Sequence, residues 1–137
     1  MALSGLEEKI EMTLVTQYDV RVPVPVRLYY LSADPYAVQL SFDVSPDEVV
    51  RWTFARELLA QGMTAPAGIG DVKITPIGSI HNRRFSIELE TNEGFARLEG
   101  LAAPVSSWLE KTYETIPAGS ESDAIDIDRI LEELLAH

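Results

Sequence analysis

Few residues in this 137-residue sequence have the types and spacing that catalysis requires. Ser79 and His81 stand two positions apart, but no G-x-S-x-G turn surrounds them to expose a nucleophile. Glu88 and Glu90 could work as paired carboxylates, yet on an alternating strand they belong to the solvated face. There is no cysteine, and no group of histidines and acids has the spacing of metal ligands. The sequence therefore predicts a protein that is not an enzyme and has no catalytic, metal-binding or cofactor-binding residues.

A glycine-rich segment, Gly68 to Gly70, begins like a dinucleotide-binding loop. Such a loop holds a pyrophosphate where it opens a helix, because the first N–H groups of the helix point at the anion. Here the segment leads into residues 71–77, which are predicted to form a strand. The phosphate-binding geometry is therefore not expected.

Single-stranded nucleic acid is the alternative ligand that the residues allow. Arg83 and Arg84 abut Phe85, and Lys73 and Arg97 fall on strands predicted in the same half of the chain. Cations beside aromatic rings on a sheet are typical of sequence-tolerant single-strand binders. A formal charge of −11 argues against this reading because it repels polyanions. Lys73, Arg83, Arg84 and Arg97 are the candidate residues of this alternative.

Charge and length indicate one soluble, cytoplasmic domain that covers residues 1–137. The start of the chain has neither the basic nor the apolar stretch of a signal peptide. No apolar run approaches the roughly 18 residues that a membrane span needs. Residues 118–137 carry six acids and one arginine, a net charge of −5.

Alternation of apolar and polar residues predicts four strands in the first half of the chain. Apolar side chains fall on even positions between Ile10 and Val22, which indicates one long antiparallel strand with a wet face. Pro23 and Pro25 flank Val24; since proline has no N–H to donate, this segment predicts a bend or an edge and is a candidate contact loop. Further strands are expected at about 26–31, 36–42 and 49–54.

The stretch RWTFARELLAQG, residues 51–62, changes period in mid-run. Its alternating start continues the fourth strand, and its second half has the spacing of a short helix over 55–61, with Gly62 as a left-handed stop. Trp52, Phe54 and Leu59 would then reach one core from two elements. This pattern predicts a structural corner and not a binding site.

The second half of the chain predicts strands at about 71–77, 84–90 and 95–99, then a helix over 101–112. An acidic linker at about 118–124 and an amphipathic helix at about 125–136 follow. The predicted fold class is therefore α+β, with two antiparallel sheets: four strands and a helix, then three strands and a helix, plus the C-terminal helix.

The C-terminal helix is the best candidate for a contact surface. Its apolar residues recur at i, i+3, i+4, i+7 and i+8: Ile127, Ile130, Leu131, Leu134 and Leu135. A helix of this length is marginal in water by itself, so the stripe must dock somewhere. Docking on its own domain is the commoner outcome, and docking on a neighbouring subunit or another protein is the functional alternative.

Several segments stand in a characteristic order along nearly the whole chain. They are PVPVRLYY, ADPYAVQLSF, WTFARELLAQGM, GDVKITP, PAGSE and DIDRILEELLAH. This set, above all DPYAV together with WTFARELL, resembles the SsgA-like proteins of sporulating actinomycetes. The complete C-terminal section is most similar to the SsgB-type members of that family.

The resemblance implies a non-enzymatic role in cell division and sporulation, at septum sites. Such members help localise or assemble the tubulin-like GTPase FtsZ, together with an SsgA-type paralogue. The implied fold is Whirly-like, as in the plant single-strand DNA-binding proteins, and the implied assembly is a homotrimer. Candidate residues for contacts with partners or other copies are then Pro23, Val24, Pro25 and the five aliphatic residues of the C-terminal stripe.

Overall fold

The computed structural model describes residues 5–16, 18–91 and 94–135, apart from the side chains of residues 91 and 124–129. Its elements follow one another as β1 (Gly5–Val15), β2 (Arg21–Leu31), β3 (Ala37–Ser45), β4 (Glu48–Ala55), α1 (Arg56–Gly62), β5 (Val72–Ser79), β6 (Asn82–Thr91), β7 (Gly94–Leu101), α2 (Ala102–Thr115) and α3 (Glu121–Leu135).

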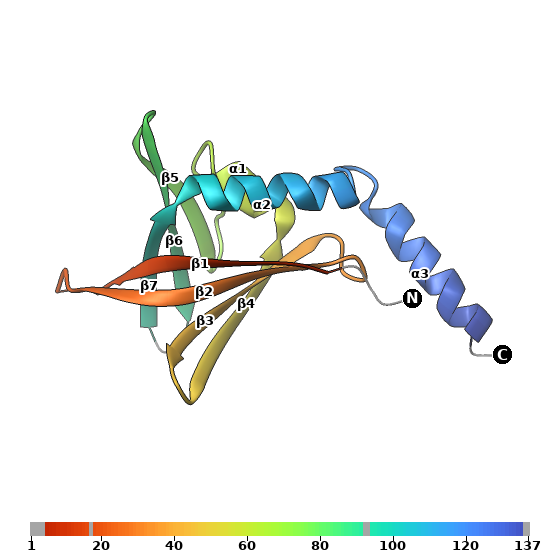
Figure 1. The fold of residues 1–137 in the computed structure, drawn as a ribbon, viewed down its shortest axis with the longest axis horizontal. Coiled ribbons are helices and arrows are strands. Elements are labelled where there is room, and N and C mark those ends of the chain that lie inside the picture. Colours follow the sequence, from red (N-terminus) through yellow and green to blue (C-terminus); the bar gives the residue numbers. More distant parts are fainter. Residues whose placement is uncertain (1–4, 17, 92–93, 136–137) are drawn as a thin grey trace.

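The strands form a single seven-stranded sheet in the order β4-β3-β2-β1-β7-β6-β5, with antiparallel neighbours throughout. The sheet curls into a half-barrel (Figure 1). β1 makes it continuous, because β1 pairs with β2 along its whole length while Thr13 to Val15 pair with Arg97 to Glu99 of β7. The predicted fold class, α+β with two antiparallel sheets in a Whirly-like arrangement, is therefore wrong. The molecule is mostly β, with three helices in its described part.

The long strand predicted between Ile10 and Val22 is two strands joined by a hairpin. β1 ends at Val15 and β2 begins at Arg21, and these two residues face each other across the ladder. In the β1–β2 ladder, each even-numbered residue of β1 lies opposite an even-numbered residue of β2, and both point to the same face of the sheet. The alternation therefore runs through the turn without a break, which is why it could not reveal the turn.

Pro23 and Pro25 lie within β2, so of the two predicted alternatives, a bend or an edge, the bend is wrong. They face Thr13 and Glu11 of β1, and the described ladder between β2 and β3 begins only at Val26. This end of β2 therefore has one free side, where residues without an N–H are tolerated. Both prolines are exposed, while Val24 between them is buried on the opposite face.

The core lies on the concave side of the sheet, where α2 packs against β1 and β6 (Figure 1). Val105, Trp108 and Leu109 of α2 are buried there, which confirms the helical spacing predicted for this segment. They join Met12 and Phe85 from the sheet in one hydrophobic cluster. Because α2 covers this side, charged residues such as Glu11, Arg97 and Glu99 lie on the opposite face of the sheet.

The change of period in residues 51–62 is confirmed as a corner, with β4 ending at Ala55 and α1 beginning at Arg56. The predicted role of Gly62 is wrong, since its φ is not positive and the helix ends through Met63 at φ −75°. A Cβ at Gly62 would instead overlap the side chain of Ile74, which is fully buried on β5. Glycine is required here because α1 and β5 approach closely.

We expect Gly62→Ala to lower the free energy of unfolding by about 1–3 kcal/mol, because the new methyl group overpacks the contact with Ile74. Chemical denaturation would measure the change. Gly70→Ala is the matched control, since a Cβ there meets nothing within 4 Å. Equal stability of the two variants would contradict the close-approach role of Gly62.

Candidate functional site

The apolar stripe of the C-terminal helix is exposed. α3 begins at Glu121, so part of the predicted linker at 118–124 is its first turn. Ile130, Leu131, Leu134 and Leu135 are between 50% and 85% exposed, and the helix extends away from the sheet (Figure 1). The side chain of Ile127 lies outside the described residues. These four described residues of the stripe therefore do not dock on their own domain, which leaves the functional alternative open.

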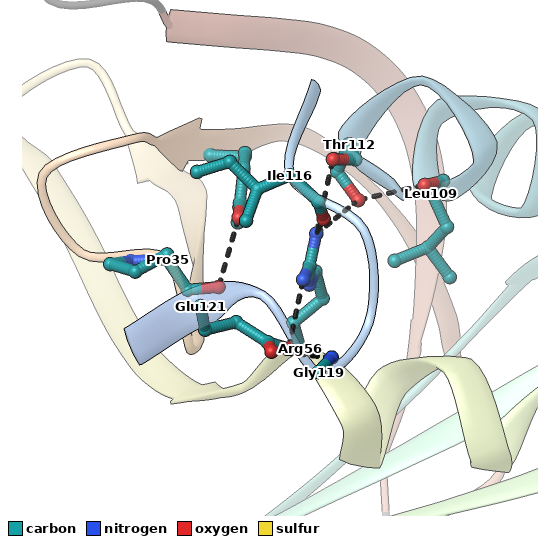
Figure 2. Close-up of polar contacts among 8 residues, drawn as sticks. Pro35, Arg56, Leu109, Thr112, Ile116, Gly119 and Glu121 are labelled. Carbon is teal, nitrogen blue, oxygen red and sulfur yellow. Dashed lines mark hydrogen bonds and ion pairs between the residues drawn. The ribbon is translucent and has the colours of Figure 1, made fainter. Parts of the chain in front are cut away.

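Arg56 fixes the direction in which α3 leaves the body. Its side chain is only 1% exposed, and its guanidinium lies between the end of α2 and the start of α3 (Figure 2). Nη1 donates to the carbonyl oxygens of Thr112 at 3.1 Å and Ile116 at 2.9 Å, and Nη2 donates to Oε2 of Glu121 at 2.9 Å. We call this group, Arg56 with Thr112, Ile116 and Glu121, the Arg56 clamp.

Two tyrosine rings enclose the guanidinium. Its central carbon lies 4.0 Å from the ring centroid of Tyr113 and 4.9 Å from that of Tyr30. The face of an aromatic ring attracts a cation, and this attraction strengthens where water is excluded. Burial raises the pKa of both hydroxyl groups, and the charge of Arg56 partly offsets the rise. The Tyr30 hydroxyl also donates to the carbonyl of Pro35 at 2.9 Å, which ties the β2–β3 turn to the clamp.

Glu121 completes the clamp from the first turn of α3. Hydrogen bonds from its own backbone N–H and from Arg56 lower the pKa of its carboxyl group. Its Oε1 also accepts from the N–H of Gly119 at 2.7 Å, where the chain turns at φ +91°. The Glu121 carboxylate therefore binds both the turn and Arg56. Its negative charge is also stabilised by the positive end of the α3 dipole.

No motif or periodic pattern in the sequence marks Arg56 as a key residue. The available signal was an arginine at the start of a short helix whose neighbours, Phe54, Leu58 and Leu59, are apolar. A cation at such a corner must either reach solvent or be paired in the interior. Its partners, however, lie 56 to 65 residues further along the chain.

An apolar groove opens at the end of the half-barrel remote from the clamp. It has a volume of about 330 Å³. The side chains that form it come from β1 to β4, β6 and β7, and include Val24, Phe42, Val44, Trp52, Phe95 and Leu98. Val44 and Phe95 are more than half exposed. Of the three contact candidates on β2, Val24 lies in this groove, while Pro23 and Pro25 are exposed on the other face.

Two of the four candidates for nucleic-acid binding, Arg84 and Arg97, lie close to the carboxylate of Glu99. Glu99 of β7 is buried, and its carboxylate lies 3.1 Å from Arg97, 3.2 Å from Arg21 and 3.9 Å from Arg84. We call this group the Glu99 cluster. Its arginines are between 36% and 52% exposed, and Glu88 of β6 lies opposite Arg97 on the same face of the sheet.

The other two basic candidates lie apart from this cluster. Lys73 faces Glu88 across the β5–β6 ladder, and Arg83 lies near the β5–β6 turn, opposite Gly78. The structure thus brings Arg84 and Arg97 together and leaves Lys73 and Arg83 separate. The four cations do not form the continuous basic track that a nucleic-acid strand would follow.

The two pairs of residues first considered for catalysis lie at different places along the β5–β6 hairpin. Ser79 ends β5 and His81 is exposed in the turn that follows. Glu88 and Glu90 lie on the polar face of β6, with Glu88 opposite Arg97. Among the described residues, no group of three or more histidines and acids could hold a metal ion. No helix in the same part of the chain is long and apolar enough to cross a membrane.

Comparisons with known proteins point to one family. Residues 24–121 match the family described as the Streptomyces sporulation and cell division protein SsgA. A relative from Thermobifida fusca, named sporulation-specific cell division protein SsgB, is 44% identical over an alignment of 138 positions, which covers 99% of this chain and all of the relative.

Two solved structures share the fold. The SsgA-like sporulation-specific cell division protein from Thermobifida fusca is 40% identical, with a TM-score of 0.89 over 97% of both chains. A second structure, whose description states that mutations in SsgB correlate to longitudinal cell division during sporulation of Streptomyces coelicolor, is 37% identical. Its TM-score is 0.84 over 89% of this chain and 96% of that one.

We expect Arg56→Met to reduce the free energy of unfolding by about 3–5 kcal/mol, because it leaves the buried partners of the clamp without their cation. Arg51→Met on β4 is the matched control, since Arg51 is exposed and its loss should change stability by less than about 0.5 kcal/mol. Chemical denaturation of both variants measures the difference. Similar values would show that the clamp does not stabilise the fold.

The clamp should weaken in acid. The folded pKa of Glu121 lies below its ordinary value of 4.5, so the ionised carboxylate stabilises the native state above that pH. This contribution is lost as the pH falls through the lowered pKa. The difference in unfolding free energy between wild type and Glu121→Gln should therefore be constant near neutral pH and vanish in strong acid. A difference that does not change with pH would contradict the assignment.

Proposed function

This chain belongs to the SsgA family of sporulation and cell division proteins, and we propose that it is a non-enzymatic regulator that helps localise or assemble FtsZ in the cytoplasm at septum sites. Its relatives are named sporulation-specific cell division proteins. In this proposal the protein acts by contact with other proteins, including FtsZ, an SsgA-type paralogue and further copies of itself.

The exposed stripe of α3 is the observation that carries the proposal. The Arg56 clamp directs α3 away from the sheet. The helix exposes four aliphatic side chains to solvent: Ile130, Leu131, Leu134 and Leu135. A contiguous apolar surface of this kind marks a site for another macromolecule. An amphipathic helix binds such a partner by laying its apolar face in a groove.

Self-association would strengthen contacts with a polymer. In the proposed homotrimer, three copies of α3 or of another contact surface face a filament at once. After one contact forms, the others act at a raised effective concentration, so that weak contacts add up to useful avidity. A regulator that works in this way needs no tight individual site.

The test is sedimentation of assembled FtsZ with this protein. Wild type should pellet with the polymer and increase the amount of polymer recovered. Leu131→Asp with Leu134→Asp should weaken binding more than about tenfold, because burying each leucine side chain is worth about 1.5–3 kcal/mol.

Glu132→Gln with Glu133→Gln provides the matched control, since these exposed acids lie on the same helix outside the stripe. The control should pellet nearly as well as wild type. Wild-type protein that neither pellets with FtsZ nor changes its assembly would overturn the proposed function. Equal binding by both double variants would exclude the stripe as the contact.

A further inference from the structure

We propose that an extended segment of another protein pairs with the free edge of β4 as a further strand of the sheet. The segment places alternate apolar side chains at the mouth of the groove and carries lysine or arginine at both ends. β4 is the outermost strand on one side of the half-barrel (Figure 1). This surface is separate from the stripe of α3, so the inference goes beyond the proposed function and does not depend on FtsZ.

The backbone of β4 has free hydrogen-bonding groups along its outer side. The N–H of Arg56 donates to the carbonyl of Tyr36 at 2.7 Å, one pair beyond the end of the β3–β4 ladder. Since hydrogen-bonded pairs alternate with non-hydrogen-bonded pairs in an antiparallel ladder, the even residues of β4 bond to β3 and the odd ones point outward. In the described part of the chain, no backbone hydrogen bond outside the ladder involves the outward residues Val49, Arg51 and Thr53.

The opposite edge of the sheet, β5, is protected against such pairing. Ile74 exchanges backbone hydrogen bonds of 2.8 and 2.9 Å with Ala67, so its N–H and carbonyl point outward and are already bonded. The next outward position is Pro76, which has no N–H to donate. Proline and a covering loop are common means by which proteins prevent strand addition at an edge.

Two shorter free stretches are protected in similar ways. Because the even residues of β3 bond to β4, its odd residues bond to β2, where Ser41 lies opposite Arg27. The odd positions of β2 therefore point toward β3, and beyond the end of that ladder they are Pro25 and Pro23. On β1, residues 7–11 are charged at every position but one, and α2 packs against this strand. β4, in contrast, has no proline, and no described segment pairs with its outer side.

A strand added to β4 would also reach the apolar groove. Val50 and Trp52, on the core face of β4, contribute to the groove, whose volume is about 330 Å³. Opposed side chains on one face of a sheet have Cβ atoms about 4.5–5.5 Å apart. Alternate side chains of the added strand would therefore lie beside Val50 and Trp52. Main-chain hydrogen bonds give such complexes their affinity, and pockets for alternate side chains give them specificity.

Charge favours a basic segment of a different protein over a second copy of this chain. Asp47 and Glu48 are exposed where β4 begins, and Glu57 is exposed just after it ends. If the β4 strands of two copies paired, acids would meet acids near both ends, whether the strands ran parallel or antiparallel, and like charges repel. Lysine or arginine at both ends of the added segment would instead complement these acids, which selects the partner more than it raises affinity.

The test measures binding of a synthetic peptide with this chemistry. The peptide alternates valine and threonine over six residues, has two lysines at each end, and carries a terminal fluorescent label. Fluorescence anisotropy gives its dissociation constant. Thr53→Pro is the decisive variant, because it removes one outward N–H and leaves the hydrogen bonds between β4 and β3 in place. Thr53→Ala is the matched control, since it changes the same exposed side chain and keeps the N–H.

Wild type and Thr53→Ala should bind the peptide with similar affinity, and Thr53→Pro should bind it about tenfold more weakly or worse. A peptide with glutamate in place of each lysine should also bind the wild type about tenfold more weakly. Circular dichroism checks that the variants keep the fold. If Thr53→Pro does not fold, Val49→Pro removes the outward N–H nearest the β3–β4 turn and takes its place.

Equal peptide binding by wild type and Thr53→Pro would exclude the edge of β4 as the site. Absence of binding to the wild type at millimolar peptide, or equal binding of the lysine and glutamate peptides, would also overturn the inference. If light scattering shows dimers of the wild type but not of Thr53→Pro, a second copy occupies the edge and the basic segment is wrong. FtsZ sedimentation, which tests the stripe of α3, decides the proposed function separately.

Discussion

Burial of one guanidinium group organises the helical part of this protein. A cation that leaves water loses its hydration, and hydrogen bonds, an opposite charge or aromatic rings around the ion must offset that loss. Arg56 is surrounded by two carbonyl oxygens at the end of α2, a carboxylate at the start of α3 and two tyrosine rings, while its Nε has no hydrogen-bond partner in the described structure. The need to satisfy one ion therefore joins the β4–α1 corner, α2 and α3 in a single arrangement.

Local alternation predicted most strands, because a half-buried strand places its apolar residues at every second position. The pairing of the strands with one another could not be predicted from the sequence. The pairing of Val15 with Arg97 in β7 joins residues that are far apart in sequence, and it turns two expected sheets into one. The first hairpin could not be recognised, because Leu14 and Val22 are both even-numbered and lie on the same face of the sheet, on either side of the turn.

Part of the candidate site could likewise be predicted from the sequence, and part could not. Helical spacing predicted the stripe of α3, but whether Leu134 would be covered depended on the direction of the helix. That direction is set by a contact between Arg56 and Glu121, 65 residues apart, for which the sequence carries no periodic signal. The close approach at Gly62 was missed for a similar reason, because the side chain that requires it, Ile74, belongs to another element.

The attachment of α3 has a consequence for how such a protein can evolve. The described ties between this helix and the body run through its first residue, Glu121, while the distal turns stand clear of the sheet. Under the proposed function, mutations in those turns would change the contact surface of the helix at little cost to folding. In the same proposal, the contact surface can then diverge through substitutions in the distal turns of α3 while the sheet keeps its structure.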